Sequence, residues 1–432
     1  ENEEKKAGAA FPVSYENRLE AKTAIKRELY GLLSARTGKT LPWGTLTGIR
    51  PTKIALSRLD QGVPEEEIRE FMEKTYLTSR EKIDLSLEIA EREKELLSHI
   101  DYENGYSLYV GIPFCPTTCL YCSFTSYPIG AWEKKMDQYL AALFKELDYV
   151  AETMKGRTLD TVYFGGGTPT ALKAEELDAI LTRIGERFDL SSVKEFTVEA
   201  GRPDSITEDK LKTLRAHGIS RISINPQTFS DQVLANIGRR HTAQDILDCY
   251  AQARAAGHQD INMDLIAGLP GDTVEGFTQS LKQAIALDPE NITVHTLTLK
   301  RASRIVIEDQ KENDYADVAA MLEQCSMLAQ AGYQPYYLYR QKNTLQNLEN
   351  VGWCKPGHEG YYNIYIMEEV QTILSAGAGG STKLVADGGK RMQRIFNFKY
   401  PTEYIQRFAE VLERKEGVIA FYDHDLGPET TG

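Results

Sequence analysis

Three of the six cysteines, Cys115, Cys119 and Cys122, lie in one short stretch, with three and then two residues between them. Thiolates are soft ligands that suit iron–sulfur clusters or zinc. A four-iron cluster usually takes four cysteines, so three cysteines in one loop leave one iron without a protein ligand. The amino and carboxylate groups of a small molecule such as S-adenosylmethionine could bind that iron, and an electron from the cluster could then cleave the sulfonium bond and release a radical. The spacing therefore predicts a [4Fe-4S] cluster on these cysteines.

A structural zinc site is the main alternative for clustered cysteines. Zinc prefers a closed site of four ligands, which pairs of C-x2-C spacing commonly supply, and this chain has no second pair. Three core cysteines without any ligand are a further alternative, but cysteine is too rare in this chain for chance to explain the grouping. Ligand type and number favour the cluster.

The segments that must hold these cysteines repeat the order strand, loop, helix. The candidate strands are 106–112, 161–164, 195–199, 221–225, 262–266 and 293–299. The candidate helices between them are 133–155, 174–187, 207–217, 231–256 and 273–287. Repeated βα units predict a parallel sheet, and six units are too few for a closed barrel of eight strands. We therefore expect an α/β fold with a partial (β/α)6 barrel, whose active residues lie at the carboxyl ends of the strands.

Two motifs follow the second and third candidate strands. F-G-G-G-T-P at 164–169 contains Gly166, Gly167 and Thr168, and glycines allow the backbone to approach a ligand closely. A tight turn between strand and helix is the alternative for this motif. Glu199 ends the third strand, where a carboxylate could accept hydrogen bonds from a ribose or an amino group.

Polar residues also follow the later strands. Gln227 lies in I-N-P-Q-T-F, and Arg239 lies twelve residues further on in N-I-G-R-R-H. Asp264 ends the fifth strand and Thr298 the sixth. A guanidinium group suits a carboxylate, and an aspartate suits hydroxyl or amino groups. Each of these residues, taken alone, could instead have a structural role.

C-x3-C-x2-C with an aromatic residue, Tyr121, before the last cysteine resembles the signature of the radical S-adenosylmethionine family. The flanking Y-V-G-I-P-F-C, which contains Tyr109, resembles the oxygen-independent coproporphyrinogen III oxidases and their relatives. The stretch 41–54 resembles the N-terminal region of the HemZ-type branch. The resemblance implies that the cofactor-binding residues are Tyr109, Tyr121, Gly166, Gly167, Thr168, Glu199, Gln227, Arg239, Asp264, Thr298 and Ser381. Gln227, Arg239 and Asp264 would line a site for a second S-adenosylmethionine.

The resemblance also implies an activity. The expected reaction is oxygen-independent oxidative decarboxylation of coproporphyrinogen III propionates to vinyl groups, which forms protoporphyrinogen IX in porphyrin and haem biosynthesis. A reduced flavodoxin- or ferredoxin-type protein would donate electrons. Two departures from the oxidases bear on this activity: Phe124 replaces a fourth cysteine and Gly111 replaces a histidine. The alternatives are a haem chaperone, although this chain lacks the HN-x-x-YW motif of that group, and a haem-modifying radical enzyme.

Composition limits the other classes of function. The 432 residues carry a net charge of −13, which does not favour a nucleic-acid partner. No apolar run is long enough for a membrane span, and the few cysteines suit a reducing cytoplasm. The first residue is not methionine, which indicates a piece of a longer protein. The oligomeric state has no signal in the sequence.

The rest of the chain predicts two accessory parts. We expect a helical region at 1–103, a radical S-adenosylmethionine core at 104–300, and an α+β extension at 301–432 that closes the active site. A loose tail at 1–12 precedes an amphipathic helix at 15–36, with Ile25, Leu29, Leu32 and Leu33 on one face. A helix follows Pro64, and Thr78 with Glu81 predicts a capping box for another helix that ends near residue 99.

The C-terminal part has weaker patterns. They predict a helix at 308–331, a strand at 334–340, a loop at 352–362, a glycine-rich return at 374–382 and a helix at 402–415. Cys249 and Cys325 fit helix cores, and Cys354 fits a structural thiol.

The sequence leaves the roles of several other residues open. His241 and His295 lie near strand ends. The loop 41–54 either packs Trp43 between domains or binds an anion. The candidate cations for substrate propionates are Arg50, Lys53, Arg301, Arg304 and Arg340.

Overall fold

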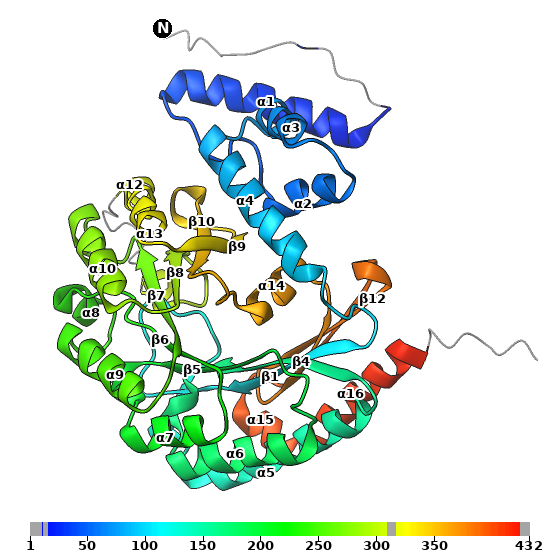
Figure 1. Cartoon of the computed structure of the whole chain (residues 1–432), viewed down its shortest axis with the longest axis vertical. Coiled ribbons are helices and arrows are strands. Elements are labelled where there is room, and N and C mark those ends of the chain that lie inside the picture. Colours follow the sequence, from blue (N-terminus) through cyan, green and yellow to red (C-terminus); the bar gives the residue numbers. More distant parts are fainter. Residues whose placement is uncertain (1–10, 12–15, 309–316, 424–432) are drawn as a thin grey trace, which may run out of the picture.

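The structure is a computed structural model that describes residue 11 and residues 16–308 and 317–423. An 11-stranded sheet, in the order β13-β12-β11-β1-β4-β5-β6-β7-β8-β10-β9, forms its centre. Figure 1 shows the sheet curved, with helices α5 to α10 along its outer side. The strands of this sheet are β1 (Gly105–Ile112), β4 (Thr158–Gly166), β5 (Glu195–Gly201), β6 (Arg221–Ile224), β7 (Asp260–Ala267), β8 (Asn291–Thr296), β9 (Gln334–Arg340), β10 (Glu349–Cys354), β11 (Thr372–Ala376), β12 (Ser381–Ala386) and β13 (Arg391–Phe396).

The strands predicted at 106–112 through 293–299 all form, and neighbours from β1 to β8 pair in parallel. In β5 to β8, buried apolar residues alternate with polar residues that line the cavity inside the barrel. The helices that connect them are α5 (Met136–Thr153), α6 (Ala174–Arg187), α7 (Glu208–Ala216), α8 (Asp231–Asn236), α9 (Ala243–Ala255) and α10 (Val274–Leu287). The predicted partial (β/α)6 barrel is confirmed.

One predicted helix of this core is wrong. The segment 231–256 forms two helices, α8 and α9, rather than one. Gly238, with a left-handed φ of 77°, lies between them, and Thr242 caps α9 by accepting a hydrogen bond from the Asp245 amide.

Strands outside the parallel core widen the sheet on both sides. β11 pairs with β1 in parallel, and β12 and β13 continue from it in antiparallel order. On the other side, β10 and β9 follow β8 in antiparallel order. The predicted strand at 334–340 is confirmed as β9, whereas the predicted loop at 352–362 is wrong at both ends. β10 runs to Cys354 and a helix begins at Tyr361.

The remaining helices of the C-terminal part are short except for the last. They are α11 (Arg304–Ile307), α12 (Val318–Glu323), α13 (Ser326–Gln330), α14 (Tyr361–Glu368), α15 (Pro401–Gln406) and α16 (Phe408–Asp423). The helix predicted at 308–331 is wrong as one element, because α12 and α13 divide its described part, and 309–316 lie outside the described residues. The helix predicted at 402–415 corresponds to α15 and α16.

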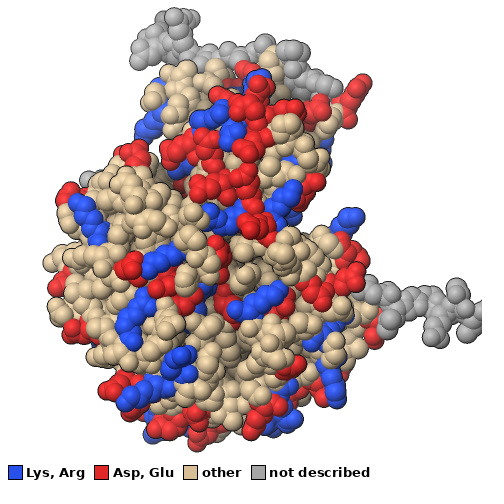
Figure 2. All heavy atoms as spheres, in the orientation of Figure 1, with Lys and Arg blue, Asp and Glu red and all other residues tan. Residues whose placement is uncertain are grey.

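The N-terminal helices lie to one side of the barrel (Figure 1). They are α1 (Arg18–Thr37), α2 (Thr52–Asp60), α3 (Glu65–Tyr76) and α4 (Arg80–Leu97). The predicted cap of α4 is wrong: Ser79, not Thr78, accepts the hydrogen bond from the Lys82 amide. Figure 2 shows acidic side chains gathered over these helices, and α3 alone begins with three consecutive glutamates.

The helix predicted at 15–36 forms as α1, but its apolar face is not covered by described residues. Ile25, Leu29 and Leu33 are each at least half exposed. In contrast, α2, α3 and α4 share a buried apolar cluster with Tyr336 and Tyr337 of β9. The division of the chain at residues 103 and 300 stays a prediction.

Candidate functional site

One cavity of about 710 Å³ contains every residue that the sequence predicts to hold the cluster or the cofactor. This volume lies in the range of ligand pockets. The predicted residues that line it are Cys115, Cys119, Cys122, Tyr109, Tyr121, Gly166, Gly167, Thr168, Glu199, Gln227, Arg239, Asp264, Thr298 and Ser381. They meet because parallel strands end at one edge of the sheet. The binding role of each residue stays a prediction.

The cysteine loop is fixed to the barrel by backbone hydrogen bonds. Cys115 ends β2 (Phe114–Cys115), which pairs with β3 (Tyr127–Pro128) where the loop returns. The Leu120 amide donates to the Ile237 carbonyl (3.0 Å), and the Leu120 carbonyl accepts from the Ile305 amide (3.1 Å). These contacts fix the middle of the loop between the end of α8 and the start of α11.

Hydrogen-bond donors surround the sulfur atoms. The Thr168 hydroxyl lies 3.3 Å from Cys115 Sγ, and Arg202 Nη1 lies 3.7 Å from Cys119 Sγ. Arg202 is itself buried, and its Nε and Nη2 donate to the two carboxylate oxygens of Asp204 (2.9 and 2.7 Å). Donors and cations of this kind stabilise thiolate ligands and tune a cluster's reduction potential.

The three thiols fit a cluster with several irons. Among the described residues, no three Cys, His, Asp or Glu side chains are close enough to share a single metal ion. Each cysteine of an iron–sulfur cluster binds a different iron, so the sulfur atoms need not meet at one point. Three soft donors around one cavity, with Thr168 and Arg202 beside them, match this requirement.

The glycine motif packs against the strand that leads into the cysteines. The Gly167 amide donates to the Ile112 carbonyl and the Thr168 amide to the Phe114 carbonyl, both at 2.7 Å. A Cβ at residue 167 would lie 2.6 Å from the Phe114 oxygen, which no real side chain tolerates. The glycine therefore permits the close approach that places Thr168 beside Cys115.

A stack of tyrosines forms one wall of the cavity, with Glu199 at its edge. Tyr163 of β4 and Tyr362 of α14 stack with ring centroids 4.3 Å apart, and Tyr109 lies 6.2 Å from Tyr163. The Tyr163 hydroxyl donates to Glu199 Oε1 at 2.5 Å. Desolvation raises the pKa of Glu199 to about 7, and the nearby charge of Asp264 adds to this shift.

Asp264 has the opposite shift. Burial acts to raise its pKa, but the hydrogen bond and charge of His295 and the hydrogen bond from Asn262 outweigh burial and hold the pKa below its ordinary value. His295 Nε2 lies 3.6 Å from the carboxylate, and Asn262 Nδ2 donates to it at 2.8 Å. Two carboxyl groups in one cavity thus have different affinities for protons.

Polar atoms without partners face this part of the site. The buried atoms Asn225 Oδ1, Gln227 Oε1 and Arg239 Nε make no hydrogen bond to any described residue. The terminal nitrogens of Arg239 are engaged, because they donate to the Asn225 carbonyl and the Tyr121 hydroxyl. Gln227 also has a left-handed φ of 68°, which costs free energy in a non-glycine residue. Unpaired buried polar groups and a strained backbone are what a polar ligand would relieve.

None of the five cations predicted for substrate propionates lines the cavity. Besides Arg202, Arg221 and Arg239, its cations are Lys300, Lys383 and Arg394. Arg50 instead pairs with Glu369 (2.7 Å), and Arg304 pairs with Glu308 (2.6 Å).

The loop 41–54 packs as its structural alternative predicts. Trp43 is fully buried and its indole nitrogen donates to Glu349 (2.7 Å). Arg340, also buried, donates to the backbone carbonyls of Leu46 and Asn347. The loop thus joins the N-terminal helices to β9 and β10.

Sequence reasoning missed several residues of the site. Arg202 follows β5, so the rule that selected Glu199 could have found it. Tyr163 immediately precedes the glycine motif and lines the same cavity. Tyr362, Lys383 and Arg394 come from the C-terminal part, where no motif marks them.

Phe124 and Gly111 also have clear positions. Phe124 lines the cavity and is 76% exposed. A Cβ at residue 111 would lie 3.1 Å from the Tyr109 ring, so the ring would have to move to admit a larger side chain.

The three cysteines predicted as structural are buried, whereas the two histidines predicted near strand ends differ in position. Burial raises the pKa of Cys249 and Cys325 to about 12, and Cys354 is fully buried. His241 is buried outside the cavity lining, whereas His295 lines the cavity beside Asp264.

A second hollow, of about 560 Å³, lies between α9 and β8 and holds none of the predicted residues. Its cation, Arg254, is already paired with Glu290 at 2.8 Å. Throughout the described ranges, every helix is too short or too polar to traverse a bilayer.

Comparisons with known proteins support a common origin for this site. A family model described as the radical SAM superfamily matches residues 109–284. The oxygen-independent coproporphyrinogen-III oxidase-like protein HemZ of Bacillus subtilis (strain 168) is 42% identical over 403 residues, which cover 92% of this chain and 80% of HemZ. The heme chaperone HemW of the same organism is 31% identical over 306 residues, which cover 70% of this chain and 76% of HemW.

A solved structure resembles a large part of this chain. Coproporphyrinogen III oxidase (HemN) from Escherichia coli, described as a radical SAM enzyme, superposes with a TM-score of 0.59 at 25% identity. The match covers 73% of this chain and 72% of that chain.

Proposed function

Because this chain belongs to the radical S-adenosylmethionine superfamily, among the oxygen-independent coproporphyrinogen III oxidase-like proteins, we propose that it decarboxylates the propionates of coproporphyrinogen III to vinyl groups. The observation that carries the proposal is a single cavity. It joins the three cysteines to a wall of tyrosines and to the cations Lys300, Lys383 and Arg394. A macrocycle of four pyrrole rings with several carboxylates needs both aromatic surface for its rings and positive charge for its carboxylates.

Cys115, Cys119 and Cys122 would hold the cluster, and Thr168 and Arg202 would stabilise their thiolates. When bound, the cluster and S-adenosylmethionine supply a radical that removes one hydrogen atom from the substrate. Each vinyl group then forms with loss of carbon dioxide and one electron, so the reaction also needs an electron acceptor.

The chain's own residues would bind and orient the two ligands. Glu199, as a carboxylate, would accept hydrogen bonds from the hydroxyl or amino groups of S-adenosylmethionine. Asp264 stays ionised to lower pH and suits the same role at a second cofactor site, beside the unpaired oxygen of Gln227. The tyrosine stack would exclude water from this side of the cavity.

The substrate carboxylates would bind the cavity's cations. Lys300 follows β8 and forms no ion pair with a described residue. Lys383 and Arg394 stand at the opposite edge of the sheet and share one carboxylate, Glu369, with Arg50 (3.1, 3.7 and 2.7 Å). Three cations around one carboxylate leave excess positive charge next to the cavity.

The test is anaerobic. The cluster is reconstituted, S-adenosylmethionine is added with dithionite or with a reduced flavodoxin or ferredoxin, an electron acceptor is supplied for the electron that each vinyl group releases, and 5′-deoxyadenosine is measured with and without coproporphyrinogen III. The proposal expects substrate-stimulated cleavage, carbon dioxide and protoporphyrinogen IX. Cleavage of the cofactor without protoporphyrinogen IX would refute the assigned substrate.

Haem binding without decarboxylation is a second candidate, because Phe124 stands exposed at the position where the resembled oxidases carry a cysteine. One relative is named as a heme chaperone. Tight, stoichiometric haem binding together with cofactor cleavage that coproporphyrinogen III does not stimulate would favour this function.

A further inference from the structure

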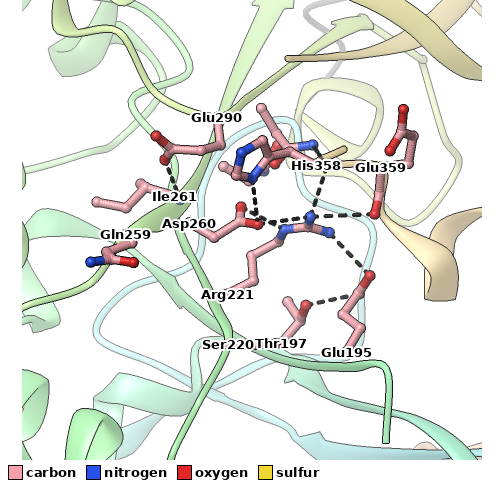
Figure 3. Close-up of polar contacts among 12 residues, drawn as sticks. Glu195, Thr197, Ser220, Arg221, Gln259, Asp260, Ile261, Glu290, His358 and Glu359 are labelled. Carbon is pink, nitrogen blue, oxygen red and sulfur yellow. Dashed lines mark hydrogen bonds and ion pairs between the residues drawn. The ribbon is translucent and has the colours of Figure 1, made fainter. Parts of the chain in front are cut away.

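A network of charged residues closes the barrel at the end opposite the cysteines. Glu195, Arg221 and Asp260 are the first residues of β5, β6 and β7. Figure 3 shows their side chains turned toward one another and toward the backbone at His358 and Glu359. This backbone belongs to the segment between β10 and α14.

Arg221 is the centre of this network, which we call the latch (Glu195, Arg221, Asp260 and the backbone of 358–361). It pairs with Asp260 (2.9 Å) and Glu195 (3.1 Å), and it donates to the carbonyls of His358 (2.8 Å) and Glu359 (3.4 Å). Arg221 is only 6% exposed, so these bonds replace nearly all of its contact with water. A bidentate, desolvated arginine is a rigid connector.

The latch is closely packed at Gly360. A Cβ at this residue would lie 2.9 Å from the Tyr336 hydroxyl and 3.0 Å from Arg221 Nη1. The backbone φ of Gly360 is −84°, which any residue can adopt. Glycine is therefore needed here for space and not for backbone freedom.

The latch is hydrogen-bonded to α14, the helix that supplies one of the stacked tyrosines of the cavity wall. Glu195 Oε2 accepts a hydrogen bond from the Tyr361 amide at 2.7 Å, at the first residue of α14. The next residue, Tyr362, is 5% exposed and stacks on Tyr163, whose hydroxyl donates to Glu199. The bond made at the closed end of the barrel and the aromatic ring in the cavity thus belong to adjacent residues.

We infer that Arg221 and Glu195 are positioning residues for cofactor binding, because they hold α14 so that Tyr362 supports Tyr163 and Glu199 in the cavity. Charged groups at this end of a barrel usually serve stability. The difference here is that α14 begins at the latch and lines the cavity with Tyr362, Ile366 and Met367. The inference rests on the proposed function, since it assumes that S-adenosylmethionine binds beside Glu199.

The test uses Gly360→Ala, which leaves every charge in place, with Gly185→Ala as its control, since a Cβ at residue 185 meets no atom within 4 Å. The dissociation constant of S-adenosylmethionine is measured by calorimetry on the reconstituted protein. Hydrogen exchange of the peptide 358–366 reports opening of the latch, and iron content and thermal midpoint report the cluster and the fold. We expect Gly360→Ala to exchange faster and to bind the cofactor about 3- to 10-fold more weakly, as for one loosened aromatic pair.

The pH dependence of binding adds a readout that a purely structural latch would not change. Glu199 faces Tyr109 of β1, Tyr163 of β4, Asp264 of β7, His295 of β8 and Tyr362 of α14. If Tyr362 moves, water reaches Glu199 and its pKa falls from about 7 toward the ordinary value. The pH at which binding is half lost should therefore be lower in Gly360→Ala than in the parent.

Tyr362→Leu keeps the inference testable if Gly360→Ala fails to fold. It removes the ring without altering the latch and must also weaken cofactor binding. Unchanged binding in Tyr362→Leu, or in a Gly360→Ala protein whose latch has opened, would overturn the inference. A parent protein that neither binds nor cleaves S-adenosylmethionine would instead overturn the proposed function.

Discussion

Replacing Glu369 with glutamine should tighten the binding of a carboxylate-bearing tetrapyrrole. Glu369 caps the end of α14 with a left-handed φ of 53° and lies among Arg50, Lys383 and Arg394. Its carboxylate binds Lys383 and Arg394, the cations that we assign to a substrate carboxylate. Glutamine keeps the size of the side chain but frees the cations, and Arg50 still donates to the Met367 carbonyl (2.8 Å), so α14 stays anchored.

The size of the effect follows from the charges. Two unit charges about 4 Å apart interact by about 4 kcal/mol at an effective dielectric constant of about 20. Lys383 is largely buried, but the side chain of Arg394 is 55% exposed, so salt and water screen much of this term. A gain of about 1–2 kcal/mol remains, which corresponds to about 5- to 30-fold tighter binding.

The assay is fluorescence titration of the reconstituted protein with coproporphyrin III at low and high salt. Glu410→Gln is the matched control, since it removes one carboxylate from an exposed ion pair with Arg407 away from the cavity. The gain for Glu369→Gln should shrink as salt rises. Equal or weaker binding, or the same gain for the uncharged tetramethyl ester, would refute the assignment of these cations to substrate carboxylates.

Two further predictions concern pH and stability. Because the pKa of Glu199 is raised to about 7, its carboxylate form is half populated at pH 7, predominates at pH 8 and is mostly lost at pH 6, so S-adenosylmethionine should bind more weakly at pH 6 than at pH 8. Calorimetry at both pH values measures this difference in affinity. Glu199→Gln should reduce the difference, and an unchanged pH dependence in that variant would contradict the prediction. Lys82→Met should cost about 3–5 kcal/mol of unfolding free energy, because it leaves buried Glu349 without its ion pair at 2.8 Å. Denaturant unfolding measures this loss against exposed Lys74→Met, and equal stabilities would show that Glu349 is not held by Lys82.

The sequence was most informative where local chemistry and strand order coincide. Cys115, Cys119 and Cys122 have a spacing that only a few metal sites use, and the motifs around Glu199 and Asp264 follow strands whose parallel order brings their ends together. The alternation of strand and helix therefore predicted both the partial barrel and the residues that line its cavity.

Contacts between distant segments had no such signal. Lys383 and Arg394 reach the cavity only because β12 and β13 extend the sheet beyond β11, a pairing that depends on the tertiary fold. Arg50 lies in a loop for which the sequence left packing between domains and anion binding open, and its partner Glu369 is 319 residues away. The break between α8 and α9 was visible as Gly238, but helical periodicity on both sides concealed it.

The contacts of Trp43 have a consequence for the order in which the protein can fold during synthesis. Its hydrogen-bond partner, Glu349, lies 306 residues further along the chain, and the apolar cluster beneath α2 to α4 is completed by residues of β9 and α14. A ribosome that adds about 5–20 residues per second needs about 15–60 s to make that length of chain. During this interval the apolar side chains of the first helices lack the residues that bury them in the finished protein. They need another binding partner that covers them until the last third of the chain has been made.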